Sequence, residues 1–216
     1  MFGVELTEII LMIPAVLIGL TVHEFSHAYI AVLLGDSTPK DQGRLTLNPV
    51  PHIDIMGLVL LLFAGFGWAK PVQINPNNFK NPKGDDLLVS IAGPFSNILF
   101  AIIMAGVIKL LITYTGGIFS SERFGENITL VLFFIVYINI LLSVFNMIPI
   151  PPLDGSHILL SFIPDRYESF KAGFSRYGRF FLMALILLSR FSGRSLLPIG
   201  LLTESILYGL FNFMNI

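Results

Sequence analysis

The sequence predicts an all-α polytopic membrane protein with about five to six transmembrane helices, a re-entrant segment and short membrane-associated β-strands. Of its 216 residues, 54% are hydrophobic and 12% are charged, whereas roughly 25% are charged in soluble domains. The mean hydropathy is +0.79. Several apolar runs also reach the roughly 20 residues that a helix needs to cross a bilayer. These observations argue against a soluble globular domain and a disordered chain.

Net charge and cysteine content narrow the possible chemistry. The net charge of −1 provides no basic surface for phosphate, so we expect no nucleic-acid partner. The chain has no Cys, so any metal site must use His, Asp or Glu. Residues 1–10 contain no Lys or Arg ahead of the first apolar run. We therefore expect this run to be retained rather than removed as a signal peptide.

Three apolar runs are long enough to span a membrane, and they cover residues 8–34, 87–113 and 129–148. The second contains one charged residue, Lys109, which lies near one end and can extend its ammonium group to the interface. The third contains no charged residue.

Two further regions are apolar but less regular. Residues 55–68 are too short to span comfortably, so we interpret them as a half-span or re-entrant element. Near the C-terminus, residues 177–190 and 195–214 are apolar but are interrupted by Arg190 and Arg194. They predict either two further spans or a short hairpin.

Two segments flanking the half-span alternate apolar and polar residues with period two. They are residues 44–48, with Leu45 and Leu47 on one face, and residues 71–75. Each is followed by a turn signal, because both end at an Asn-Pro pair. We predict short strands at the membrane surface here, with irregular loop as the alternative.

The distribution of Lys and Arg predicts the orientation in the membrane. Residues 35–86 and 149–179 are rich in these residues, whereas residues 114–128 contain only Arg123. Because basic loops stay on the cytoplasmic side, the first two regions should be cytoplasmic, and residues 114–128 and the N-terminus should lie outside. The sequence thus predicts a multi-pass protein of the cell membrane.

The strongest chemical signal is His23-Glu24-Phe25-Ser26-His27 within the first apolar run. Residues four apart share a helix face, so His23 and His27 can reach one cation, and neutral imidazole is a good zinc ligand. Glu24 lies about 100° around the helix from His23, where a general base would stand. A chance polar stripe is the alternative, but ionisable groups inside a span are costly unless they are paired or metal-bound.

Asp154 is the candidate for a third ligand. It follows the uncharged third run in a proline-rich stretch, residues 149–152, that cannot continue a helix. The predicted topology brings Asp154 and the two histidines to the same, inner side of the membrane. The site would then open toward the cytoplasm. An ordinary helix N-cap is the alternative for Asp154.

At these residues the chain resembles the site-2 protease family of intramembrane zinc metalloproteases. HEFSH at 23–27 and NMIPIPPLDG at 146–155 match its two signatures, and the stretches at 44–49, 67–76 and 92–97 are similar to its compact prokaryotic branch. The resemblance covers about residues 8–163. No inserted PDZ or CBS domain, and no helix ahead of the HEFSH helix, is expected.

The resemblance implies one Zn²⁺ per chain, with His23, His27 and Asp154 as ligands and Glu24 as catalytic base. It implies one membrane-embedded metalloprotease domain over 1–216, with a catalytic core at about 8–163 and C-terminal helices at about 164–216. Transmembrane proteins would be the substrates and membrane lipid the surroundings, while the oligomeric state is left open. A metal transporter and an inactive scaffold that binds membrane proteins are the alternatives.

Four other polar residues are weaker candidates. Asn146 belongs to the second motif and could hold the substrate backbone or an oxyanion, and Asn139 lies seven residues earlier on the same helix face. Interhelical hydrogen bonds are the alternative for both. His157 could support the metal ligands, and His52 could gate or approach the metal. A structural role is the alternative for both histidines.

Gly93 and Asn97 lie four residues apart in AGPFSN. We interpret them mainly as a helix-packing face with one polar bond, and a substrate contact is the alternative.

Overall fold

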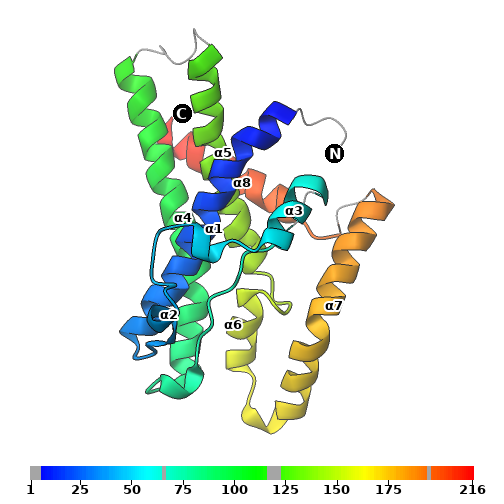
Figure 1. Cartoon of the computed structure of the whole chain (residues 1–216). Coiled ribbons are helices and arrows are strands. Elements are labelled where there is room, and N and C mark those ends of the chain that lie inside the picture. Colours follow the sequence, from blue (N-terminus) through cyan, green and yellow to red (C-terminus); the bar gives the residue numbers. More distant parts are fainter. Residues whose placement is uncertain (1–5, 65–66, 116–122, 194–195) are drawn as a thin grey trace.

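The computed structural model describes residues 6–64, 67–115, 123–193 and 196–216. Its centre is a bundle of three long helices, α1 (Leu6–Leu33), α4 (Pro82–Thr115) and α5 (Arg123–Asn146) (Figure 1). Among the described residues, three helices are long and apolar enough to cross a membrane, namely Ile10–Leu33, Pro82–Tyr114 and Asn127–Asn146. These agree with the three runs predicted from the sequence.

Small residues allow the three helices to approach closely. Ala15 on α1 and Ala101 and Ala105 on α4 are fully or almost fully buried in the contacts with α5. Small side chains are typical of helix contacts in membranes, where packing rather than the hydrophobic effect holds helices together. The donors of the candidate site are therefore carried by a closely packed scaffold.

The connection from α1 to α4 contains short elements only. They are α2 (Thr38–Asp41), η1 (Val50–His52), α3 (Ile55–Ala64) and η2 (Pro76–Asn78). Helix α3 has ten residues, about 15 Å of helix, which is half of the hydrocarbon core. Its length fits the predicted half-span, and re-entry into the membrane stays a prediction.

The strand prediction is wrong for both segments. The described residues contain no strand, and residues 45–47 form bends whereas residues 67–75 are irregular. One backbone hydrogen bond, from Lys70 N to His52 O, joins this part of the chain to the segment before α3. Four other backbone groups of this segment, Lys70 O, Pro71 O, Val72 N and Asn75 N, bond to buried charged side chains instead of a neighbouring strand. The alternative of irregular loop is therefore the observed one.

The C-terminal part comprises α6 (Asp154–Phe162), η4 (Asp165–Tyr167), α7 (Glu168–Ser192) and α8 (Ile199–Met214). Helix α8 packs on α4 and α5 and has 16 residues, so it is shorter than a usual span. Helix α7 stands apart from the three-helix bundle (Figure 1). The predicted total of five to six spans is not confirmed, because these two helices do not qualify by length and apolarity.

Candidate metal centre

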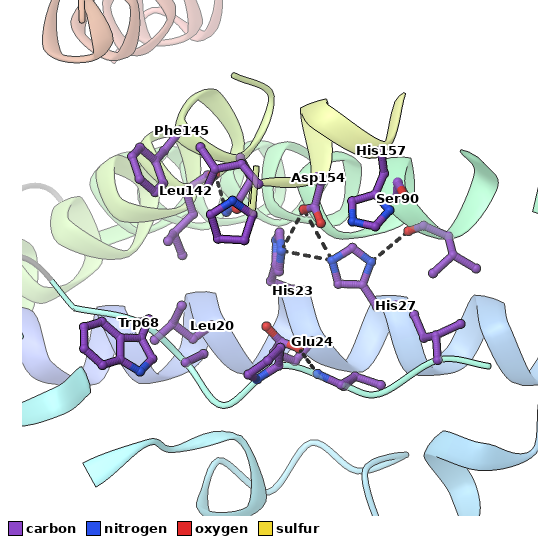
Figure 2. Close-up of a pocket in the computed structure, with 18 of the residues that line it drawn as sticks. Leu20, His23, Glu24, His27, Trp68, Ser90, Leu142, Phe145, Asp154 and His157 are labelled. Atoms are coloured by element: carbon purple, nitrogen blue, oxygen red, sulfur yellow. Dashed lines mark hydrogen bonds and ion pairs between the residues drawn. The ribbon is translucent and has the colours of Figure 1, made fainter. Parts of the chain in front are cut away.

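Two histidines of α1 and one aspartate of α6 converge on a single point. His23 and His27 are four residues apart on one helix face, and their Nε2 atoms are 3.0 Å apart. Asp154 Oδ2 lies 3.1 Å from His23 Nε2 and 3.4 Å from His27 Nε2. Figure 2 shows the carboxylate pointing from α6 toward both rings. Both histidines are buried.

The loop before α6 aims the carboxylate of Asp154. Helix α5 ends at Asn146, and residues 147–153 form turns that lead into α6. A Cβ on Gly155 would lie only 2.3 Å from Met147 O, so this close contact requires glycine. Leu153 is the N-cap residue and Asp154 is the first residue of α6. The N-cap alternative for Asp154 is thus not what is observed.

Hydrogen bonds on the far side of each ring determine which nitrogen is free. His27 Nδ1 is 2.7 Å from Val89 O, a carbonyl that can only accept, so Nδ1 carries the hydrogen. His23 Nδ1 is 2.7 Å from Asn97 Oδ1. In neutral rings both Nε2 atoms then present lone pairs to each other and to Asp154 Oδ2. Asp154 Oδ2 is buried and has no hydrogen-bond partner.

These three donors fit a metal ion. Three lone-pair atoms packed against one another repel unless a cation lies between them, and they form the cluster His23, His27 and Asp154 that could hold one. Their separations of 3.0, 3.1 and 3.4 Å are close to the ligand–ligand spacing of about 3.3 Å in a tetrahedral site with bonds near 2.0 Å. Two imidazoles and a carboxylate, without sulfur, suit zinc.

Asn97 is held in its orientation by a chain of hydrogen bonds between helices. Its Nδ2 donates to Gly19 O over 3.0 Å and to Asn139 Oδ1 over 2.8 Å, which leaves Oδ1 to accept from His23. Asn139 in turn donates to Ile135 O. Asn139 is fully buried and is not among the residues that line the cavity around the donors. The contact observed for Asn139 is therefore the interhelical hydrogen bond to Asn97.

We predict that Asn97→Leu weakens zinc binding about 10–100-fold, the usual effect of removing the partner of a metal-ligating histidine. The variant removes the acceptor for His23 Nδ1 and the donor to Gly19 O. A competition titration with a zinc indicator measures the effect on the purified protein. Asn212→Leu, at an exposed position of α8, serves as the control. Equal zinc affinity in Asn97→Leu and the unmodified chain would contradict this role.

Glu24 lies beside the three donors and is held by a backbone amide. It is 8% exposed, and its Oε2 accepts a hydrogen bond of 2.8 Å from Val72 N. Val72 belongs to residues 67–75, which we name the strap. Figure 2 shows Glu24 on α1, below the two histidines and next to the strap.

Two further buried charged residues hold the strap. The guanidinium of Arg44 donates to Pro51 O, to Lys70 O over 3.0 Å and to Pro71 O over 2.9 Å. Asp36 Oδ2 accepts from Asn75 N over 2.8 Å. Sequence reasoning missed both as parts of the site. An arginine in a short loop and an aspartate just after the first span were the signals present.

Asp36 also organises the turn after α1. Its Oδ1 accepts from the backbone and hydroxyl of Thr38. Burial alone would raise the pKa of Asp36, but hydrogen bonds from the Thr38 side chain and from the backbone of Asn75 lower it below its ordinary value. A charged carboxylate therefore joins the end of α1 to the end of the strap.

A cavity of about 580 Å³ surrounds the donors. Its walls come from α1, the strap, α4, α5 and α6, and they include Glu24, Asn146 and His157. Asn146 Nδ2 donates to Leu142 O. His157 Nδ1 lies 3.4 Å from Asp86 Oδ2, and this carboxylate raises the pKa of the imidazole. Both residues thus border the cavity.

The structure places His52 elsewhere. It is 2% exposed and lines a neighbouring, smaller cavity, and its Nε2 lies 2.9 Å from Thr46 O. The expectation that His52 approaches the metal is therefore not met in the described structure.

Comparison with known proteins identifies the family. The profile of Peptidase family M50 matches residues 11–185, which is most of the chain and contains both motifs. The chain belongs to this family, the site-2 protease family. The M50 match extends beyond α6 into α7.

Curated relatives of the chain carry zinc metalloprotease names. The chain is 38% identical over 176 residues to "Putative zinc metalloprotease YwhC" of Bacillus subtilis, covering 82% of this chain and 78% of the relative. It is 28% identical over 184 residues to "Putative zinc metalloprotease Rip2" of Mycolicibacterium smegmatis, covering 83% and 66%. No solved structure matches the chain significantly. Family and names together support a zinc metalloprotease.

Proposed function

We propose that this M50 protein is an intramembrane zinc metalloendopeptidase that hydrolyses peptide bonds within or near transmembrane segments of membrane proteins. The main support is that the donor atoms of His23, His27 and Asp154 meet at one buried point, with the carboxylate of Glu24 beside them. His23, Glu24 and His27 belong to a helix that is long and apolar enough to cross a membrane. Peptide hydrolysis would then take place at membrane depth.

The residues of the chain have separate tasks in this reaction. His23, His27 and Asp154 would hold the zinc ion, which supplies the positive charge that acidifies water and polarises a peptide carbonyl. Glu24 accepts a proton from the attacking water and returns it to the leaving amine. The amide of Val72 donates to Oε2 of this carboxylate, which makes Oε1 the more basic oxygen and the one we expect to take the proton.

Asn146 and His157 would contact the substrate. Both line the cavity, Asn146 from α5 and His157 from α6. The carboxamide of Asn146 can bond the substrate backbone, and His157, with its pKa raised by Asp86, can donate a hydrogen bond to a carbonyl oxygen. The support for both substrate contacts is that Asn146 and His157 line the same cavity as the metal donors His23, His27 and Asp154.

The surroundings of the enzyme follow from the same proposal. The whole chain, residues 1–216, would act as one membrane-embedded domain with transmembrane proteins as substrates and lipid around its apolar helices. The basic loops 35–86 and 149–179 favour a cell-membrane protein with the site open to the cytoplasm.

The test compares the full-length protein with its Glu24→Gln variant in detergent, with zinc and a model transmembrane substrate. We expect cleavage by the unmodified chain and a loss of about 10²–10⁴-fold in Glu24→Gln, the usual contribution of a general base. Both proteins should retain one zinc per chain by elemental analysis, and a chelator should abolish cleavage. Glu204→Gln, at an exposed position of α8, should cleave normally.

Three outcomes would overturn the proposal. Cleavage by Glu24→Gln at the unmodified rate would remove Glu24 from the reaction. Zinc flux in vesicles without any proteolysis by the unmodified chain would favour the transporter, and zinc binding with neither activity would favour the inactive scaffold.

A further inference from the structure

A second cavity of about 110 Å³ adjoins the one that holds the metal donors. The two cavities share lining residues from α1, the strap and α5, namely Leu20, Gly67, Trp68, Ala69 and Leu142. A peptide lying in the larger cavity would therefore pass beside the smaller one. Most of the smaller cavity is lined by apolar side chains, among them Val16, Ile138 and Leu141.

His52, one of the lining residues, carries an unusual polar atom. The ring is 2% exposed, and Nε2 lies 2.9 Å from Thr46 O. A carbonyl can only accept, so Nε2 carries the hydrogen and Nδ1 of the neutral ring has a lone pair. Nδ1 is buried and has no hydrogen-bond partner. Buried polar atoms in native proteins nearly always have a partner, so this one indicates a ligand.

Asp54, the other ionisable residue of the lining, is already engaged. Its Oδ1 accepts a hydrogen bond of 2.9 Å from Gly57 N at the start of α3. Among the buried side-chain atoms of this lining, His52 Nδ1 is the acceptor without a partner. A fitting ligand combines a small apolar part with one hydrogen-bond donor.

We propose that this cavity is a subsite for a substrate side chain, and that it prefers the hydroxyl residues threonine and serine close to the scissile bond. The proposal rests on the peptidase function proposed above. In a helix, these hydroxyls bond to the carbonyl four residues earlier, and local unwinding of the substrate removes that partner. His52 Nδ1 replaces it, while the apolar walls contact the methyl group of threonine. Valine has the same shape but leaves Nδ1 unpaired.

Trp68 offers a direct readout of binding. It is the single Trp of the chain, it lines both cavities, and its backbone is fixed against α3. A Cβ on Gly57 would lie only 2.1 Å from Trp68 O. Its fluorescence should therefore respond when a peptide enters, whether or not the peptide is cleaved.

The experiment uses the full-length zinc-loaded protein and transmembrane model peptides that differ by threonine or valine at each of four positions on either side of the cleaved bond. We expect one position at which threonine raises kcat/KM about tenfold over valine. The same peptides are titrated into the Glu24→Gln variant, with Trp68 emission as the signal. The threonine peptide should bind about tenfold tighter at the same position.

His52→Gln is the decisive variant, because glutamine can still donate to Thr46 O but offers no acceptor at the position of Nδ1. We expect the threonine-to-valine ratio to fall to within about twofold, and the Thr113→Val control on α4 to leave the ratio unchanged. The subsite is refuted if no position prefers threonine, or if the preference survives in His52→Gln. If the unmodified chain cleaves no peptide, the peptidase proposal fails, and the Trp68 titrations alone decide on the subsite.

Discussion

Gly93→Ala is expected to remove zinc from the protein and to abolish cleavage with it. A Cβ on Gly93 would lie 2.4 Å from His27 Nε2 and 2.6 Å from His23 Cε1, both shorter than side-chain contacts ever are. The rings cannot move aside easily, because their Nδ1 atoms are bonded to Val89 O and Asn97 Oδ1 on the same helix. One face of α4 thus holds both imidazoles. It does so with the carbonyl of Val89, the glycine at position 93 and the side-chain amide of Asn97, which follow one another at intervals of four residues.

The expected loss of zinc affinity is at least on the order of 100-fold, because it combines the clash with loss of the hydrogen bonds that orient the ligands. Competition with a zinc indicator measures the loss, and far-ultraviolet circular dichroism shows whether the helices persist. Gly106→Ala is a matched control on the same helix, since its Cβ would meet no atom within 4 Å. Normal zinc affinity in Gly93→Ala would mean that α4 does not hold the rings as described.

Arg44→Gln is expected to release the strap and to lower kcat/KM more than tenfold while zinc stays bound. The guanidinium joins the carbonyls of Pro51, Lys70 and Pro71, next to Val72, whose amide holds Glu24. Losing charge-assisted hydrogen bonds costs about 1.5–3 kcal/mol each, enough to free a segment whose side chains are partly exposed. The zinc donors do not touch Arg44, so metal content should not change.

Hydrogen exchange of residues 69–74 and quenching of Trp68 fluorescence measure the release directly. Arg44→Lys should give an intermediate effect, because an ammonium group lacks the planar fork that reaches three carbonyls at once. Arg166→Gln, at an exposed position before α7, is the control. If Arg44→Gln leaves hydrogen exchange and fluorescence quenching unchanged, Arg44 does not hold the strap. If the variant loses zinc, the effect of the substitution is not specific to the strap.

The strand prediction failed for a reason that the strap makes clear. The alternation of apolar and polar residues in 71–75 indicates that one side of the segment faces the protein. An edge strand and an irregular strap share that property. The choice depends on where the backbone hydrogen bonds go. Here the backbone groups bond to the side chains of Glu24, Asp36 and Arg44. No local sequence pattern predicts such partners.

The sequence alone determined the three long apolar helices and the pairing of His23 with His27, because hydrophobic length and the i,i+4 repeat are local properties of a helix. It also predicted Asp154, through the proline-rich motif and the charge of the loops. Only the tertiary structure decided what holds these groups. Asn97, Val89 and Val72 are 74, 62 and 48 residues from the side chains they bond. Contacts at such separations depend on how the helices pack, and the hydrophobic periodicity of the sequence does not predict them.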